Sequence, residues 1–342
     1  MQGLARQNRY HADDLLSSAL RSLHVSGSLL LCEAYAAPWA IHIPSAERLG
    51  QLLRLEPGTR ALAFHLVEYG HCAVQTATGT KETLHAGEIA ICFGGEAHHI
   101  GDGPHGQVQN VEALLAGEPN HQHPDARGQA ASASLVCGVF LLQHTAFHPM
   151  LAALPRVMRA NLVSPVGFSS QSGIAHSMVA EMKAQAAGSA YVVERLLEVL
   201  CAQAIRAYLA TAQDAGAGWV RAIRDPVVGR AMCAMHARPG AAWSVPGLAR
   251  EVAISPSRFA ARFSAVLGDS PMAYLTKLRL HVACGMLLAT QEAVDQVAFA
   301  VGYDSAAAFN RTFKNHLGLP PGAWRAQARE PRVASLGELP RP

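Results

Sequence analysis

The chain has 342 residues, of which half are hydrophobic and 15% are charged; this length suffices for two domains, and the composition excludes a disordered protein. The net charge of +3 is unevenly distributed, because residues 224–330 hold 12 Lys and Arg against 7 Asp and Glu, whereas residues 1–223 hold 14 against 17. A basic C-terminal part is the charge pattern expected of a nucleic-acid-binding domain.

The N-terminal part begins with a short helical pattern and continues as a β domain. Residues 11–22 are predicted to form an amphipathic helix. From Ser28 to Leu142 the chain consists of short apolar runs broken by Gly and Pro, which is typical of an all-β sandwich or barrel. Within this domain, the sequence VEALLA at 111–116 is interpreted as a strand between two long loops.

The sequence carries no pattern typical of a membrane span or an export signal. The longest uncharged candidate, residues 131–147, is interrupted by Ser, Gln, His and Thr and is interpreted as a buried strand and its exit. The N-terminus has no basic start followed by an apolar block, so we expect a cytoplasmic protein. The seven cysteines occur singly, which argues against a disulfide framework and against a cysteine-cluster zinc site.

From Met150 onward the hydrophobic pattern has a helical period. Two apolar stripes, within residues 172–186 and 190–211, predict a helical hairpin. An Ala- and Gly-rich piece at 215–218 is a predicted linker. Residues 225–326 are again predicted to be helical.

Two segments near the C-terminus repeat one pattern at an offset of 49 to 50 residues. They are LAREVAISPSRFAARF (248–263) and VAFAVGYDSAAAFNRTF (297–313). Each contains a helix with a small Ala, a tight turn, a Ser expected to cap a second helix, and two Phe four residues apart that are expected to be buried. Gly302 suits the positive φ of such a turn, and Ala253 or Ile254 takes its place in the first segment. The repeat predicts two helix-turn-helix units.

Residues 225–327 resemble the DNA-binding domain of the AraC/XylS family of transcription regulators. The resemblance rests on the two repeated units and on GDSPMAYLTKLRLHVACGMLL, which is predicted to form one linking helix between them. Its most specific part is GY-x-S-x-x-x-F-x-R-x-F-K followed by G-x-x-P-x-x-W-R. The resemblance implies that both units read adjacent major-groove faces of one double-stranded DNA site.

The resemblance places candidate DNA-contacting residues on the second helix of each unit. Arg311 is expected to bind guanine edges and Asn310 to read adenine, while the alanines can only contact thymine methyl groups or read DNA shape. Phosphate contacts are expected from Arg262, Lys277 and Lys314; for the basic residues the alternative is a solvated helix face. The base-facing candidates are Ser257, Arg258, Ala260 and Ala261 in the first unit and Ala306, Ala307, Asn310 and Arg311 in the second.

Residues 24–145 resemble the cupin-like sensor domain found in some regulators of this family. The matching pieces are FHLVEYGHCAVQ, LHAGEIAICFGGEAHHI and LVCGVFLLQH. The motif G-x5-F-G-G-x2-H at 87–98 follows the second cupin motif, with Phe93 where proline is usual. The expected fold is α+β and multidomain: a cupin-like β-barrel or jelly roll with a helical hairpin, then an all-α domain with two helix-turn-helix units. The expected domains are a sensor domain at 11–150, a dimerisation hairpin at 151–213, a linker at 214–224 and the DNA-binding domain at 225–327.

The candidates for detecting a ligand or signal in the sensor domain are His65, Glu68, His98 and Cys137. Metal-binding cupins also use a His-x-His pair that this region of the sequence lacks, so their metal site is incomplete here. The resemblance to regulators that sense oxidants through a nearby cysteine makes Cys137 a candidate thiol switch, with an inert buried thiol as the alternative. His121 and His123 form a separate candidate pair for a transition metal, with a polar loop as the alternative.

These features favour a sequence-specific DNA-binding transcription regulator whose N-terminal domain senses a small molecule or a redox or metal signal. Homodimerisation is expected, RNA polymerase is a candidate partner, and neither a cofactor nor a membrane is expected. The sequence contains no catalytic motif that would indicate an enzyme. Two alternatives stay open: a metal-dependent cupin enzyme with a DNA-binding appendage, and a constitutive DNA-binding dimer without an effector.

Overall fold

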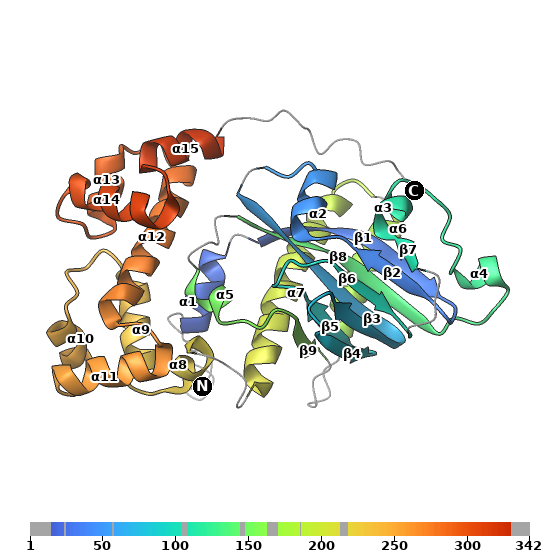
Figure 1. Ribbon diagram of the computed structural model, residues 1–342, viewed down its shortest axis with the longest axis horizontal. Coiled ribbons are helices and arrows are strands. Elements are labelled where there is room, and N and C mark those ends of the chain that lie inside the picture. The colour runs from blue at the N-terminus through green and yellow to red at the C-terminus, as the bar shows by residue number, and fades with distance from the viewer. Residues whose placement is uncertain are drawn as a thin grey trace, which may run out of the picture. The chain divides into compact units, whose positions relative to one another are not determined.

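The computed structural model divides the chain into two compact units. It describes residues 15–23, 25–56, 58–103, 108–143, 148–162, 170–184, 186–212 and 218–329. The first unit, here the sheet unit, contains the described residues of 25–143 and 154–213. The second, here the helical unit, contains those of 1–24, 144–153 and 214–331. Figure 1 labels the elements of both, and each unit is described by itself.

The sheet unit is built on a nine-stranded sheet with helices beside it. Its strands are β1 (Val25–Tyr35), β2 (Ala40–Ile43), β3 (Thr59–Thr76), β4 (Lys81–His85), β5 (Glu88–Ile91), β6 (His98–Gly101), β7 (Val108–Asn110), β8 (Ala133–Gln143) and β9 (Met158–Asn161). Its helices are α2 (Ala46–Leu52), α3 (Val111–Leu115), α4 (Pro124–Arg127), α6 (Ser170–Ala184) and α7 (Ser189–Thr211).

The sheet curls into a half-barrel of the cupin type, as expected. Its strand order is β1-β8-β3-β6-β2-β7, with β4 and β5 also paired to β3 and β9 paired to β5. Strand β3 connects the two sides of the half-barrel, because its first half pairs with β8 and β5 and its second half pairs with β4 and β6. A bulge between Val67 and Tyr69, followed by Gly70 at φ +75°, lies where β3 passes from one set of partners to the other.

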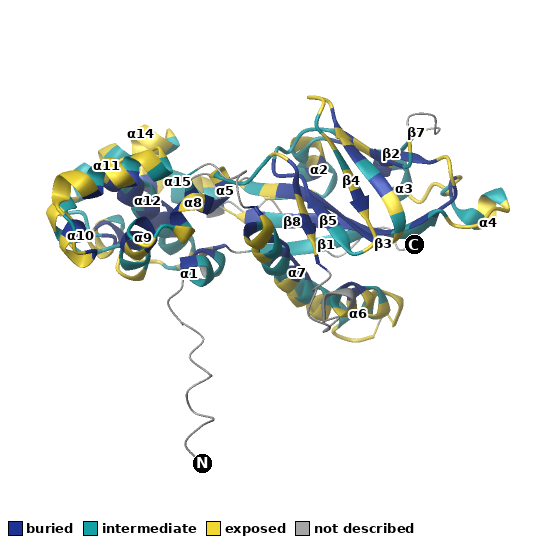
Figure 2. Cartoon of the chain, turned by 90° about the horizontal axis from the view of Figure 1, so that it is seen from below, coloured by how far each residue is buried: buried dark blue, intermediate teal, exposed yellow. Residues whose placement is uncertain are grey.

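Alternating side chains of β3 and β8 point to opposite faces of the sheet. The inner face carries Ala63, Val67 and Leu135, which belong to one buried apolar core. On the outer face, Phe64 stacks on Phe140 with ring centroids 4.5 Å apart. Helix α7 packs on β1, and Figure 2 shows how far the strands of this unit are buried.

One strand prediction for this unit is wrong, and the helical hairpin is confirmed. The two stripes at 172–186 and 190–211 form α6 and α7. The sequence VEALLA forms α3 rather than a strand, because Glu, Ala and Leu favour helix and one turn of helix directs Val111, Leu114 and Leu115 into the inner core. In the part of the chain that the structure describes, no helix is long and apolar enough to cross a membrane.

The helical unit consists of α1 (Leu15–Ser22), α5 (Pro149–Ala152) and the helices of the C-terminal region. These are α8 (Trp219–Arg224), α9 (Val228–Ala237), α10 (Val245–Glu251), α11 (Pro256–Leu267), α12 (Pro271–Ala289), α13 (Val294–Ala300), α14 (Ala306–Leu317) and α15 (Pro321–Arg329). The two helix-turn-helix units are α10 with α11 and α13 with α14, and α12 is the predicted linking helix.

The turns of the two units have the expected backbone conformation. Gly302 has φ +88° and Ala253 has φ +57°, so Ala253 rather than Ile254 occupies the glycine position of the first unit. The small residues of the first helices, Ala249 and Ala298, are buried, as close crossing of the second helix requires.

The serine caps of the two second helices differ. The Ser305 hydroxyl accepts a hydrogen bond from the backbone N–H of Ala308 at 3.2 Å, which confirms the predicted cap of α14. Ser255 stands at the corresponding position of α11, but its side chain makes no capping hydrogen bond. Ser255 is therefore the N-cap residue of α11, as predicted, but without a capping hydrogen bond from its side chain, and Pro256 follows it at the first helical position.

Three short helices pack in the helical unit although they were expected in other domains. Helix α1 contacts α9, and α5 contacts α8 and α12. The Nε2–H of His148 donates to the carbonyl oxygen of Ala19 in α1 at 3.1 Å. Residues 219–224, expected in the linker, form α8, because Trp219 is buried and donates through Nε1 to the Tyr274 hydroxyl at 3.3 Å. Linker residues 214–217 lie outside the described residues.

Candidate functional site

Helix α11 presents a polar face opposite its buried side. Phe259 and Phe263 are fully buried and hold the helix on the rest of the unit. Because residues three and four apart lie on one face of a helix, the candidates Ser257, Arg258 and Ala261 point away from these rings, and all three are exposed. Ala260 is half-buried at the edge of this face.

Helix α14 repeats the arrangement in the second unit. Phe309 and Phe313 are fully buried, while Asn310 and Arg311 are exposed. Ala307 is exposed and Ala306 is half-buried. Exposed positions follow one side of α11 and of α14 in Figure 2. Each unit therefore offers one uncovered helix face that carries a basic residue, which is the requirement for entering a major groove.

The three phosphate candidates differ in how the structure engages them. The Arg262 guanidinium pairs with the Asp225 carboxylate at 2.9 Å, and the ion pair with Arg262 and two backbone N–H groups hold the pKa of Asp225 below its usual value, against the opposing effect of burial. Lys277 Nζ lies 2.6 Å from Asp269. Among the described residues, the ion pairs include neither Lys314 nor Arg311, so both cations are available to DNA without breaking one.

In the sheet unit, two histidines and two cysteines form a buried cluster, here the His–Cys cluster: His65, His98, Cys92 and Cys137. His65 on β3 and Cys137 on β8 are directly paired across the sheet, so both side chains point to the same inner face. His98 begins β6 and Cys92 follows β5. His65, His98 and Cys92 offer ligand atoms that all lie within 4.8 Å of one another.

The hydrogen bonds fix the protonation of both imidazoles. His98 Nδ1 lies 3.1 Å from the backbone oxygen of Glu96 and must donate its proton to it. Burial lowers the pKa of His98, and it lowers the pKa of His65 well below its usual value, so both rings are neutral. His98 Nε2 is therefore an acceptor, and His65 Nε2–H donates to it at 2.8 Å. His65 Nδ1 in turn accepts from the Cys137 thiol, with a separation of 3.2 Å.

Both cysteines of the His–Cys cluster are protonated thiols. Burial raises the pKa of Cys92 to about 12. It also raises the pKa of Cys137 well above its usual value. Cys92 Sγ lies 3.5 Å from His98 Nε2. Since the thiolate is the reactive form of cysteine, a buried protonated Cys137 is poorly suited to direct attack by an oxidant.

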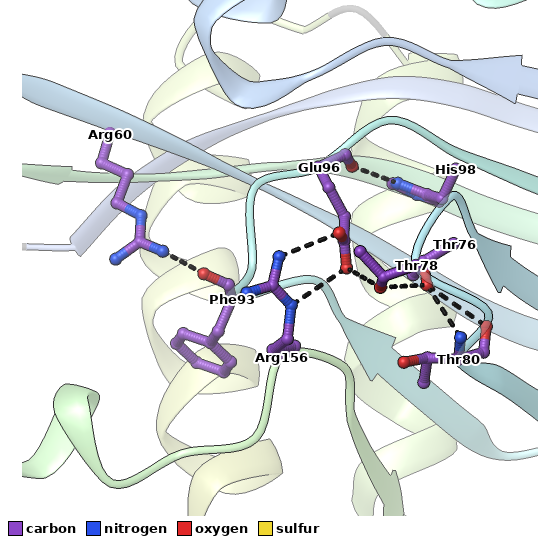
Figure 3. Close-up of polar contacts among 8 residues, drawn as sticks. All are labelled: Arg60, Thr76, Thr78, Thr80, Phe93, Glu96, His98 and Arg156. Carbon is purple, nitrogen blue, oxygen red and sulfur yellow. Dashed lines mark hydrogen bonds and ion pairs between the residues drawn. The ribbon is translucent and has the colours of Figure 1, made fainter.

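The loop between Cys92 and His98 is held from both sides (Figure 3). The Arg60 guanidinium donates to the backbone oxygen of Phe93. The Arg156 guanidinium pairs with the Glu96 carboxylate at 2.8 Å, and the Thr78 hydroxyl donates to the same carboxylate at 3.1 Å. Because Glu96 also supplies the backbone oxygen that orients His98, these contacts position the His98 ring.

Comparison with known proteins agrees with both parts of the structure. The family model described as "Cupin" matches residues 14–210, and the one described as "Helix-turn-helix domain" matches residues 248–327. An AraC-like transcription regulator of Streptomyces lividans is 31% identical over 204 residues, which are 60% of this chain and 67% of that protein. The chain belongs to the AraC family of transcription regulators. It is a DNA-binding regulator with a cupin-like N-terminal domain.

Two further proteins show the extent of the similarity. The HTH-type transcriptional regulator AlkR of Acinetobacter baylyi is 26% identical to this AraC-family chain over 323 residues, which are 92% of this chain and 100% of that protein. The solved DNA-binding domain of AdpA, in complex with a target DNA, is 30% identical and covers 32% of this chain and 99% of that chain, with a TM-score of 0.30. These two curated relatives are named as transcription regulators rather than as enzymes. This AraC-family protein is likewise a transcription regulator and not an enzyme.

The structure brings together three of the four sensor candidates of this regulator. His65, His98 and Cys137 meet in the His–Cys cluster. Glu68 is exposed, and it accepts a hydrogen bond from the Ser134 hydroxyl at 3.0 Å instead of joining them. Cys92 completes the cluster but was not predicted as a site residue. Its position six residues before His98, in the segment that resembles the second cupin motif, is the signal that could have identified it.

The candidate metal pair His121 and His123 lies elsewhere in the sheet unit. His121 is exposed. His123 stands before α4, where its Nδ1 accepts a hydrogen bond from the backbone N–H of Asp125 at 3.2 Å. This bond is a helix cap and accounts for His123 in structural terms. The metal role of the pair stays a prediction.

Proposed function

We propose that this AraC-family regulator binds operator DNA sequence-specifically through α11 and α14, and that its cupin-like domain detects a chemical signal through the His–Cys cluster. The observation that carries the DNA part is the repetition of one geometry: two buried Phe, an uncovered opposite face and an exposed Arg, at Arg258 and again at Arg311. An Arg can bind a guanine edge through two hydrogen bonds, each such pair contributing ~1–3 kcal/mol of discrimination.

The DNA proposal predicts that Arg311→Ala loses specific promoter binding. We expect its affinity for a specific site to fall by roughly 5- to 150-fold, which corresponds to ~1–3 kcal/mol. Purified full-length protein is incubated with sheared genomic DNA of its source, and the bound fragments are sequenced. The wild type should enrich a few promoter regions, and Arg311→Ala should lose them.

The matched control is Arg54→Ala, which removes the same charge from an exposed position after α2. It should retain the wild-type fragments. Equal and broad enrichment by the wild type and Arg311→Ala would show that binding depends on the phosphate backbone alone, and would refute the assigned role of Arg311.

The sensing part is supported by the chemistry of the His–Cys cluster. Polar side chains in an apolar core destabilise the fold unless they are fully hydrogen-bonded. Four side chains that can bind a metal ion or exchange a proton contact one another here. Ligand-induced regulation requires that the signal bind one conformation of the regulator more tightly than another. If the protein is instead a constitutive DNA-binding dimer, its operator affinity should be the same under every signal. The expected contact with RNA polymerase stays a prediction.

We further propose that the regulator forms a homodimer through the exposed side of α7. One side of this helix is buried, with Leu197 close to the backbone of β1 at Gly27. The other side exposes Tyr191, Val192 and Val199, which are 66%, 39% and 45% exposed. Apolar side chains gathered on a helix surface indicate an interaction face.

The dimer proposal predicts that Val199→Glu converts a dimer into a monomer, because a charge would be buried at the interface. Light scattering coupled to size-exclusion chromatography measures the molar mass. Lys81→Glu, an exposed change on β4, should leave the dimer intact. A monomeric wild type, or a dimer that survives Val199→Glu, would contradict this interface.

A further inference from the structure

The His–Cys cluster has the ligand set of a metal centre that differs from that of metal-dependent cupins. Those enzymes combine imidazoles with a carboxylate, whereas here the carboxylate candidate Glu68 is exposed and turned to Ser134. In its place the fold brings Cys92 to His65 and His98, with one ligand atom of each within 4.8 Å of the others. All three side chains are buried. A set of two imidazoles and one thiolate selects thiophilic transition metals over magnesium, calcium or manganese.

We propose that His65 Nε2, His98 Nε2 and Cys92 Sγ bind one monovalent thiophilic ion, Cu(I), and that this ion is the signal detected by the cupin-like domain. The inference rests on the proposed sensing function and names its ligand. Of the four residues of the His–Cys cluster, Cys137 is a positioning residue, because it contacts the Nδ1 side of His65, away from the ring nitrogen that faces His98.

The surroundings of the two imidazoles match those of metal ligands. A metal-bound histidine commonly donates its second ring N–H to a carbonyl or carboxylate, which fixes the ring and its tautomer. His98 already does so, since its Nδ1–H donates to the backbone oxygen of Glu96 (Figure 3), and its Nε2 is therefore unprotonated. When His65 binds through Nε2, its proton moves to Nδ1, where Cys137 Sγ at 3.2 Å is the acceptor.

The required movement of the ligands is small. Two nitrogens at ~2.0–2.1 Å from one three-coordinate ion are ~3.5 Å apart, and His65 Nε2 and His98 Nε2 are 2.8 Å apart. The two rings therefore need to separate by ~0.7 Å, which breaks the hydrogen bond between them. Cys92 Sγ lies 3.5 Å from His98 Nε2, which is already close to the spacing of two ligands on one ion.

The charge balance favours a monovalent ion. The Cys92 thiol releases its proton to solvent on binding, so the centre contains one thiolate and two neutral imidazoles. With Cu(I) the net charge is zero, whereas with Zn(II) it is +1. The cluster lies among apolar residues of the inner core, including Val67, Leu135 and Ala90, where an uncompensated charge is strongly unfavourable. A neutral complex is the one that this core accommodates.

The test is an anaerobic titration of the reduced full-length protein with Cu(I) in the presence of a chromophoric Cu(I) chelator. The wild type should bind one ion per chain. Cys92→Ala should lower the affinity at least 100-fold, and Cys137→Ala should keep the stoichiometry and lose about 10-fold. The matched control is Cys72→Ala, a buried thiol on β3 outside the cluster, which should bind as the wild type does. Equal affinities for Cys92→Ala and Cys72→Ala would overturn the site.

X-ray absorption at the copper edge of the loaded wild type requires no variant. It should show two nitrogen ligands and one sulfur ligand, and a shell of sulfur alone would overturn the ligand set.

Zn(II) added first should leave when one equivalent of Cu(I) is added; Zn(II) that stays on the same three residues would overturn the charge argument. Operator affinity with and without Cu(I) separates the two proposals: an ion bound as described without a change in operator affinity refutes the sensing function and leaves the metal site standing.

Discussion

Acidification from pH 7.5 to 5.0 is expected to lower the free energy of unfolding of the helical unit by about 4 kcal/mol through His148 and His236. Burial, reinforced by the neighbouring His281, lowers the pKa of His148 to about 3 and that of His236 to about 4. In the unfolded chain both groups titrate near ~6.5. Below pH 6.5 the unfolded state therefore binds two protons that the folded state does not.

The geometry around His236 explains why the folded unit rejects the proton. His236 Nε2 lies 2.7 Å from the Tyr274 hydroxyl, and Trp219 Nε1–H donates to the same oxygen at 3.3 Å. The hydroxyl must therefore donate its own proton to a neutral His236. Protonation would direct two N–H groups at one oxygen and would place a charge in a buried site.

The sign and size of the effect follow from linkage. Both histidines have a pKa below the unfolded value, so their neutral forms are stabilising above pH 6.5 and stability is lost as the pH falls from 6.5 toward 4 and 3. A pH of 5.0 lies ~1.5 units below the pKa of a histidine in the unfolded chain. At ~1.36 kcal/mol per unit, each histidine therefore lowers the free energy of unfolding by about 2 kcal/mol. Urea unfolding at both pH values measures this, followed by the fluorescence of the unit's tryptophans Trp219, Trp243 and Trp324.

A variant separates this effect from general acid denaturation. His236→Gln keeps a polar side chain but cannot titrate, so the loss between pH 7.5 and 5.0 should shrink by about half. His316→Gln removes an exposed imidazole of α14 and should retain the wild-type pH dependence. If His236→Gln and the wild type lose the same free energy, the histidine is not the group that destabilises the folded unit in acid.

The fold of the two helix-turn-helix units could be predicted from the sequence. Its information is local: a small residue, a turn and two Phe four apart define each unit, and the structure buries Phe259 and Phe309 accordingly. The repeated pattern could not predict the ion-pair partner of Arg262, because Asp225 lies 37 residues away and outside the repeated motif. The same reason explains the docking of α1 and α5, whose own sequences are too short to specify the surface that they cover.

The His–Cys cluster could be predicted only in part. His65 and Cys137 are 72 residues apart, and each lies on a predicted strand, but only the register of β3 with β8 makes them direct neighbours. A one-residue shift of that register would turn one of them to the outer face. A single cysteine among apolar neighbours, such as Cys92, is most often a small buried hydrophobic residue. Its role here depends on how the loop to His98 folds back.

Gly302→Ala is expected to destabilise the helical unit by about 3 kcal/mol and to weaken DNA binding. The left-handed conformation at φ +88° costs an L-residue ~1–2 kcal/mol. In addition, a Cβ at this position would lie 2.6 Å from the backbone oxygen of Gly240 and 2.6 Å from Arg279 Nη2. The Gly240 oxygen is part of the backbone, so it can move away from the new Cβ only if its whole loop moves. Arg279 is also fixed, since it donates to the backbone oxygens of Pro239 and Ala241 at 2.9 Å and 2.8 Å.

The chain supplies a control with the same backbone strain and no steric conflict. Gly318 has φ +78° at the end of α14, and a Cβ there meets no atom within 4 Å. Gly318→Ala should therefore lose only ~1 kcal/mol. Urea unfolding of both variants measures the difference, which isolates the contribution of the contact between Gly302 and Gly240. Equal losses in the two variants would show that this close approach does not limit the residue at 302.

The first helix-turn-helix unit provides the converse test. Ala253 already adopts φ +57° at the position that corresponds to Gly302, so that unit tolerates the strain which the second unit avoids. Ala253→Gly should relieve it and raise the free energy of unfolding by up to ~1 kcal/mol, after the entropic cost of glycine in the unfolded chain. A gain at 253 together with a loss at 302 is expected if the turn conformation is common to both units and only the second turn is packed against a neighbouring loop.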